Sequence, residues 1–138
     1  MKTIAQILND SKTIAIVGMS NKPDRASNGV AHYLQQHGYT VVPVNPTYAG
    51  QQILGEKVYA SLHDAAAALP AGRIDVVDCF RKPEEMLQVA RDAVAIGAGC
   101  LWMQLGVINQ EAADFASSAG LDVVMDHCMK IEHAQLGA

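Results

Sequence analysis

Short runs of apolar, often β-branched residues alternate along the chain with longer segments of helical periodicity. The runs cover Thr13 to Val17, Thr40 to Val44, Ile74 to Phe80, Cys100 to Leu105 and Leu121 to Met125. Continuous apolar runs of this length are typical of strands that are buried on both faces of a parallel sheet. The pattern therefore predicts five buried strands.

The segments between these runs predict helices. Ser27 to His37 and Glu84 to Ile96 each gather their apolar side chains on one face, and Asn109 to Ala119 opens with an N-cap residue. Two more helices are expected from Ser61 to Leu69 and around Met129 to Gln135.

Glycines mark the ends of three of these predicted helices, at Gly38, Gly97 and Gly120. Each can take the left-handed conformation that ends a helix before the next strand begins. The first ten residues contain one lysine and no long apolar run. They predict a short helix packed on the domain and not a signal peptide.

Alternation of strands and helices predicts right-handed crossovers and a doubly wound parallel sheet. We expect an α/β fold in which residues 1–138 form a single Rossmann-like domain, a length that suits one domain. About five strands would lie in the order 3-2-1-4-5, with helices on both faces. Ligands of such sheets bind beyond the carboxyl ends of the strands, near the point where the strand order reverses.

Composition narrows the function classes. The net charge is -4 and there is no basic tract, which argues against a nucleic-acid partner. No stretch approaches the roughly 18 apolar residues of a membrane span, so no membrane partner is expected. Three cysteines without CxxC spacing and five scattered histidines predict neither a disulfide framework nor a metal site. We expect a cytoplasmic protein.

Positive charge gathers where the predicted strands end. Five of the ten Lys and Arg residues follow strands directly: Lys22, Arg25, Arg81, Lys82 and Lys130. If the fold prediction is right, these cations rim one edge of an otherwise acidic protein and predict an anionic ligand. The alternative is that loops are simply polar.

The loop after the first run carries the strongest signal. Backbone N–H groups at a helix start bind anions, hydroxyls add donors, and an arginine can hold a phosphate with two parallel hydrogen bonds. Residues of this kind run from the strand end to the helix start: Gly18, Ser20, Asn21, Lys22, Arg25 and Ser27. The alternative is an ordinary connecting loop in which Ser27 is only an N-cap.

Two nucleotide fingerprints are missing. The loop contains neither GxGxxG nor GxxxxGK[ST]. The second run ends at Asn45, where NAD-binding proteins usually place an acid for the ribose hydroxyls. NAD is therefore disfavoured, whereas NADP, whose extra phosphate needs cations, remains open.

Other strand ends offer further contacts, each with a structural alternative. Pro43 and Pro46 flank Asn45 and could form a rigid wall for an adenine, or only end the strand. Phe80 could line a ligand or belong to the core. Gln104 and Gly106 could approach a ligand closely, or only form a turn.

Cys128 is the candidate nucleophile of the chain. It lies beside His127 and near Lys130, and cationic surroundings of this kind can lower a thiol pKa. Adjacent side chains seldom point at each other, so we assign Cys128 to ligand contact and not to catalysis. Cys79 and Cys100 fall in predicted strands and are expected to be inert core thiols.

Several segments together resemble a known family. IAIVGMSNKPDRAS, HGYTVVPVNP, LGEKVYASL, VVDCFRKPEE, LWMQLGVIN and GLDVVMDHCMKIEH are similar to the small stand-alone CoA-binding proteins, whose domain resembles the CoA-binding domain of the succinyl-CoA synthetase α subunit. The resemblance runs from Ser11 to Leu136. The chain departs from the family pattern at Ala26, usually proline, and at His127, usually arginine.

The resemblance implies a Rossmann-like fold that binds coenzyme A. The loop from Gly18 to Arg25 would hold phosphates. Pro43, Asn45 and Pro46 would line the nucleotide pocket, flanked by Phe80, Arg81 and Lys82. Gln104, Gly106, Cys128 and Lys130 complete the predicted binding set. The synthetase's catalytic histidine lies in a further domain that this chain lacks, so its ligase chemistry is not implied.

Together these observations predict a protein that binds CoA or an acyl-CoA, without evident catalytic machinery of its own. Two other classes remain open. One is an NADP-linked enzyme or a thiol-dependent enzyme that uses Cys128, and the other is a nucleotide-sensing regulatory subunit.

Overall fold

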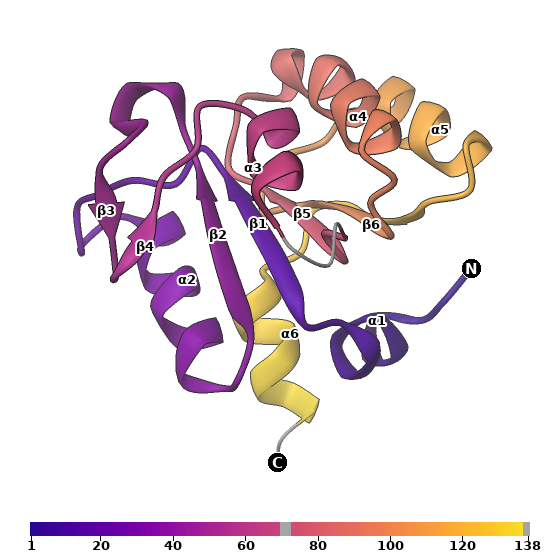
Figure 1. Cartoon of the computed structure of the whole chain (residues 1–138). Helices are drawn as coiled ribbons and strands as arrows, with labels where there is room; N and C mark the ends of the chain where they lie inside the picture. Colours follow the sequence, from indigo (N-terminus) through magenta and orange to yellow (C-terminus); the bar gives the residue numbers. More distant parts are fainter. Residues whose placement is uncertain (70–72, 137–138) are drawn as a thin grey trace.

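Five parallel strands form the central sheet in the computed structural model of the chain, which describes residues 1–69 and 73–136. They lie in the order β2-β1-β5-β6-β7, and Figure 1 labels β2, β1, β5 and β6. Their bounds are β1 (Thr13–Val17), β2 (Thr40–Val44), β5 (Val76–Cys79), β6 (Cys100–Met103) and β7 (Asp122–Val124). Each predicted run supplies one of these strands, so the predicted α/β class with a doubly wound parallel sheet is confirmed.

The predicted strand order, 3-2-1-4-5, is wrong. The third run, β5, pairs with β1, and this leaves β2 at the edge of the sheet. Pro43 gives the physical reason. Its carbonyl accepts a hydrogen bond from Tyr59 N (3.0 Å) on the side away from β1, and its ring nitrogen has no proton to donate there. A strand with proline at its middle cannot pair fully on both sides, so β2 suits an edge.

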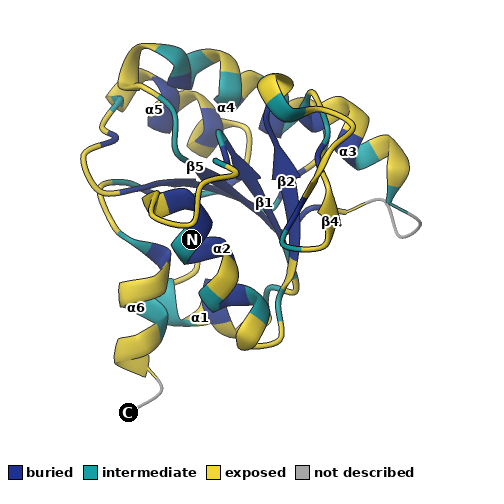
Figure 2. Ribbon diagram, turned by 90° about the vertical axis from the view of Figure 1, so that its left-hand side faces the viewer, coloured by how far each residue is buried: buried dark blue, intermediate teal, exposed yellow. Residues whose placement is uncertain are grey.

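Helices cover both faces of the sheet (Figure 1). One face packs against α3 (Leu62–Ala68), α4 (Met86–Ala95) and α5 (Gln110–Ser118). The other packs against α1 (Ile4–Asp10), α2 (Ala26–Gln36) and α6 (Met129–Leu136). Figure 2 shows the strands buried at the centre and the helices exposed on their outer sides.

Alternation along β1 explains how both faces are filled. Ala15 and Val17 contribute to the core beneath α3, α4 and α5, whereas Ile14 and Ile16 contribute to the core beneath α1, α2 and α6. Each fully buried isoleucine or valine contributes about 1.5–3 kcal/mol. The central strands are therefore held from both sides, and their carboxyl ends form a rigid base for the loops that follow.

Helix starts and stops follow the predicted signals. The side chains of Ser61 and Asn109 each accept a hydrogen bond from a backbone N–H in the first turn of α3 and α5. Gly38, Gly97 and Gly120 have φ values of 89°, 72° and 95°, as the helix-ending conformation requires.

Two features between β2 and α3 escape prediction from the sequence. The segment 46–48 forms a short 3-10 helix, η1 (Pro46–Tyr48), and an antiparallel hairpin follows from β3 (Gln52–Ile53) and β4 (Glu56–Lys57). Two-residue strands are too short to show a period of two. Leu54 and Gly55 both have positive φ at the hairpin turn (52° and 79°), but a Leu-Gly pair is a weak hairpin signal. A second 3-10 turn, η2 (Pro83–Glu85), leads into α4.

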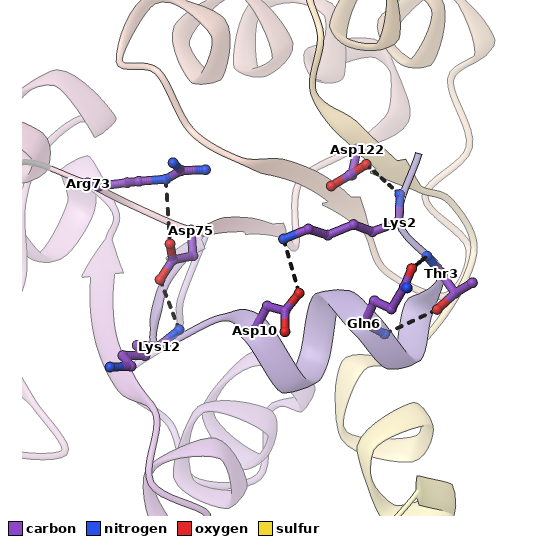
Figure 3. A network of polar contacts seen from close by, with 8 residues as sticks. All are labelled: Lys2, Thr3, Gln6, Asp10, Lys12, Arg73, Asp75 and Asp122. Carbon is purple, nitrogen blue, oxygen red and sulfur yellow. Dashed lines mark hydrogen bonds and ion pairs between the residues drawn. The ribbon is translucent and has the colours of Figure 1, made fainter.

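Polar contacts at the amino ends of the strands tie the start of the chain to the sheet (Figure 3). Asp75 Oδ2 accepts hydrogen bonds from the backbone N–H groups of Lys12 (2.9 Å) and Thr13 (3.0 Å). Its Oδ1 lies 3.5 Å from Arg73 Nε. Further contacts join Lys2 to Asp10 and Asp122, and Thr3 to Gln6.

Candidate functional site

The loop after β1 is held in shape by the protein itself. Ser20 N donates to Ser27 Oγ (2.9 Å), Asn28 Nδ2 donates to the Ser20 carbonyl (3.0 Å), and Asn45 Nδ2 donates to the Met19 carbonyl (3.0 Å). Ser27, Asn28 and Asn45 are buried. The loop is therefore organised before any ligand arrives, which lowers the entropy that binding must overcome.

Helix α2 follows this loop with its first turn uncapped. Arg25, and not Ser27, is the N-cap residue, and its side chain makes no capping hydrogen bond. Backbone N–H groups in the first turn of a helix have no partner within the helix and favour an anion. Lys22 and Arg25 are exposed beside them, and neither forms an ion pair within residues 1–69 and 73–136.

Gly18 brings the loops after β1 and β5 into contact. Its φ is 85°, and a Cβ at this position would lie 2.7 Å from the Phe80 carbonyl oxygen and 2.8 Å from Arg81 Cδ. Only glycine satisfies both the positive φ and the close approach. The contact lies between β1 and β5, where the strand order reverses, and ligands of doubly wound sheets bind at this point.

A polar cavity of about 410 Å³ opens between these loops. Cations, hydroxyls and the start of α2 surround it. Its lining residues are Gly18, Ser20, Lys22, Arg25, Ala26, Ser27, Tyr48 and Phe80.

A second cavity of about 400 Å³ adjoins the first, because Ala26 and Phe80 line both. This cavity is mostly apolar, with cations and one amide at its border. Its lining residues are Ala26, Val30, Phe80, Arg81, Lys82, Gln104, Leu105, Val107 and Cys128.

A smaller cavity of about 160 Å³ lies beside the other two, sharing Gly18 with the first and Arg81 with the second. It lies where β1 and β2 meet α3 and α4. Its lining residues include Val44, Pro46, Ala60, Ser61, Leu62 and Val89. The three cavities together follow the carboxyl edge of the sheet.

Arg81, which borders two of these cavities, also forms an ion pair with Glu85. One of its terminal nitrogens, Nη2, lies 2.9 Å from Glu85 Oε1. The hydrogen bond from this guanidinium holds the pKa of Glu85 below its usual range. Lys82 is exposed and forms no such pair within the described part of the chain.

Most of the residues predicted to bind ligand come together around these cavities. Those lining at least one are Gly18, Ser20, Lys22, Arg25, Ser27, Pro46, Phe80, Arg81, Lys82, Gln104 and Cys128. The five others are Asn21, Pro43, Asn45, Gly106 and Lys130, which are absent from the lining of all three.

Structural roles account for four of those five residues. Pro43 forms the sheet edge, and Asn45 supports the loop after β1. Gly106 has a φ of 80° and donates its N–H to Asp126 Oδ1 (2.8 Å), so it serves a turn. The Lys130 ammonium lies 5.6 Å from the centre of the Tyr33 ring.

Several lining residues were not predicted. Val30 and Val107 read as ordinary core positions in the sequence, because a wall of an apolar cavity and a core position share one hydrophobic pattern. Tyr48 lies on η1, whose existence was not predicted. Leu105 is 59 % exposed directly after β6. An apolar residue at the carboxyl end of a strand could have been recognised in the sequence as a candidate ligand contact.

A buried carboxyl group lies behind the apolar cavity. Asp78 on β5 is fully buried, and Gln104 Nε2 donates a hydrogen bond to its Oδ1. Its Oδ2 has no hydrogen-bond partner among the described residues. Burial raises the pKa of Asp78 to about 7, against the lowering effect of hydrogen bonds from Gln104 and the Cys79 backbone.

The three cysteines differ in accessibility. Cys79 and Cys100 are buried, and burial raises the pKa of both thiols. Cys128 is half-buried at the apolar cavity. The neighbouring His127 has its Nδ1 3.8 Å from Glu132 Oε2.

Within residues 1–69 and 73–136, none of the helices is long and apolar enough to cross a membrane. In the same residues, no three His, Cys, Asp or Glu side chains are grouped so that they could hold a metal ion.

An open parallel sheet with an organised, cation-bearing loop at its switch point is typical of Rossmann-like domains. Residues 12–134 match the family described as "CoA binding domain". The chain belongs to this family, and the resemblance seen in the sequence is confirmed.

Two relatives match nearly the whole of the chain. The uncharacterized protein YneT of Bacillus subtilis (strain 168) is 40% identical over 131 residues, which cover 95% of this chain and 92% of that one. A hypothetical protein from Pyrococcus horikoshii OT3 has a solved structure with a TM-score of 0.88 and 41% identity, covering 98% of this chain and 90% of that one.

A larger enzyme shares the fold. The dinucleotide-forming acetyl-coenzyme A synthetase 1 of Ca. Korarchaeum cryptofilum, solved in complex with phosphate and ADP, has a TM-score of 0.69 and 23% identity. The match covers 89% of this chain and 27% of that one. At this identity the likeness concerns the fold alone.

Proposed function

We propose that this protein binds coenzyme A, or an acyl-CoA, along the carboxyl edge of its sheet, as a binding module without chemistry of its own. The observation that carries the proposal is the junction of two unlike cavities, one polar and cationic and one apolar, across Ala26 and Phe80. CoA has the same division, with phosphates at one end and a flexible thiol-bearing arm at the other.

The phosphates fit the polar cavity by charge and by donor geometry. Lys22 and Arg25 supply two cations without internal ion pairs in the described residues, and the uncapped first turn of α2 supplies backbone N–H donors. Charge-assisted hydrogen bonds to phosphate are about twice as strong as neutral ones. Anion binding here also explains why an acidic protein keeps these cations unpaired.

The arm fits the apolar cavity. Val30, Leu105 and Val107 offer apolar contact, and Cys128 lies where a thiol-bearing arm would reach. The adenine fits the third cavity beside Pro46, whose ring adds to the apolar wall of Val44 and Leu62. In this assignment Asn45 contributes by supporting the phosphate loop, through its hydrogen bond to the Met19 carbonyl.

Thermal unfolding with added nucleotides tests the proposal. CoA at about 100 times its Kd stabilises a protein by about 2.7 kcal/mol and so raises Tm by several degrees. NAD, which lacks the thiol-bearing arm and the 3′-phosphate, should change Tm little. Equal shifts with CoA and NAD, or no shift with millimolar CoA, would contradict the proposal.

A further inference from the structure

The Asp78–Gln104 pair is unusual because one carboxylate oxygen of Asp78 has no hydrogen-bond partner among the described residues. Asp78 lies in the middle of the sheet, between Ile16 of β1 and Trp102 of β6, and has no cation among its hydrogen-bond or ion-pair partners in the described residues. The titratable groups beside it are Cys79 and Cys100, whose thiols burial keeps protonated. A buried carboxyl with one free oxygen costs stability, so a structural role alone is a poor explanation for it.

Gln104 connects this carboxyl to the apolar cavity. Its side-chain nitrogen donates a hydrogen bond to Asp78 Oδ1, and Gln104 is also one of the residues that line the cavity. The amide oxygen, Oε1, accepts no hydrogen bond from a described residue. It is also not one of the fully buried polar atoms that lack a hydrogen-bond partner. It is therefore the polar atom that this amide presents to the cavity.

We propose that Asp78 is a positioning residue, which fixes the Gln104 amide with its oxygen toward the apolar cavity so that this oxygen recognises an N–H group on the arm of the ligand. The inference rests on the proposed function and deepens it, because the arm of CoA carries amide N–H groups. A freely rotating amide would offer a donor as readily as an acceptor. The ionised carboxyl can only accept, so it removes that choice and makes the cavity selective for donors.

Paired ligands separate this role from a general effect on the fold. The Kd values of CoA and of adenosine 3′,5′-bisphosphate, which lacks the arm, are measured by calorimetry for the wild type and for each variant. Gln104→Leu should weaken CoA binding about 5- to 10-fold, the loss of one hydrogen bond, and leave the Kd of the armless nucleotide unchanged.

Variants of Asp78 test the positioning itself. Asp78→Ala should weaken CoA binding by a smaller factor than Gln104→Leu, since a freed amide still presents its oxygen part of the time. Asp78→Asn can accept from the Gln104 nitrogen through its Oδ1 or donate to the Gln104 oxygen through its Nδ2, so it should restore the wild-type Kd only in part. Gln110→Leu is the matched control, because Gln110 is exposed and bonds only to Asp114 on its own helix. Its CoA affinity should not change.

The failures are distinguishable. If the wild type binds neither ligand, the proposed function falls and this inference with it. If both bind with equal Kd, the arm contributes nothing and this inference alone is wrong. Equal losses for the two ligands in Gln104→Leu would indicate a disturbed fold and also overturn it. A wild-type Kd in Asp78→Ala would remove Asp78 from the positioning role.

Discussion

The two ends of β5 each hold an aspartate, and the protein surrounds the two carboxyls in opposite ways. Asp75, just before the strand, receives two backbone N–H groups and faces Arg73. Asp78, near the other end, receives the Gln104 amide and keeps one oxygen without a partner among the described residues.

Most of the cations divide in the same way, although Arg81 at the carboxyl edge is paired with Glu85 and Lys12 at the amino edge has no ion pair within the described residues. At the amino edge Lys2 and Arg73 are paired with Asp10 and Asp75. At the carboxyl edge the ammonium and guanidinium groups of Lys22, Arg25 and Lys82 have no ion-pair partner within the described residues. Polar groups whose partners are internal hold the fold together. Polar groups left open mark the edge where a ligand can supply the missing partner.

The largest expected effect concerns the pH dependence of stability. The pKa of Asp78 is raised from 3.8 to about 7 in the folded protein, so the neutral form is favoured there. Its contribution to the free energy of unfolding is therefore full below about pH 4, falls as the pH rises to about 7 and is constant above, a total loss of about 4 kcal/mol. Asp78→Asn should remove this loss in urea unfolding across that range. Identical pH profiles for the wild type and the variant would contradict it.

The amino edge should respond to Asp75→Ala. The substitution leaves the backbone N–H groups of Lys12 and Thr13 without their acceptor, which should cost about 2–3 kcal/mol in the free energy of unfolding. Asp75→Asn keeps one acceptor oxygen and should cost less. CoA affinity should be unchanged in both variants. Weaker CoA binding in a folded Asp75→Asn variant would show that the amino edge also affects ligand binding, and would contradict the distinction between the two edges.

The opposite outcome is expected for the loop after β1. Lys22→Ala and Arg25→Ala should each weaken CoA binding by about 1–3 kcal/mol and change the free energy of unfolding by less than about 0.5 kcal/mol. Lys2→Ala, which removes a cation from the other edge, is the control and should leave the Kd of CoA unchanged. Wild-type affinity in the Lys22→Ala/Arg25→Ala double variant would exclude this loop from the site.

Cys128 is expected to differ from the other two cysteines in its reactivity. In alkylation mapped by mass spectrometry, Cys128 should react faster than the buried Cys79 and Cys100, and bound CoA should slow its reaction. Cys128→Ser should change the free energy of unfolding by less than about 1 kcal/mol. If Cys128 reacts no faster than the other two, or gains no protection from CoA, its role is structural.

The sequence was sufficient for the strands of the central sheet and for the α-helices, but not for the hairpin, the 3-10 turns or the strand order. Continuous apolar runs locate strands because both faces of a parallel sheet are buried, and the bounds of β1 and β2 agree with prediction. Strand order depends on which edges can pair, and Pro43 contained that information. A proline inside a strand favours an edge position, and this would have placed β2 outside β1.

The candidate site also has parts that the sequence predicts and parts that it does not. Lys22, Arg25 and the start of α2 were predictable, because charge and a helix start are local signals. The wall formed by Val30 and Val107 depends on how α2 and the loop after β6 approach each other, which no local pattern records. Asp78 offered a readable signal, since an acid inside an apolar run must be buried with the strand.

The position of β1 has a consequence for how the chain folds. Ile14 pairs with Val41 on one side and with Val76 on the other, so the first strand to be synthesised is among the last to be fully paired. Long-range parallel pairing of this kind is slow and leaves apolar strand edges open meanwhile. A fragment that ends before β5 contains the whole loop after β1 but lacks β5 and the residues after it, Phe80 and Arg81, that Gly18 contacts. We expect such a fragment to aggregate rather than bind nucleotide.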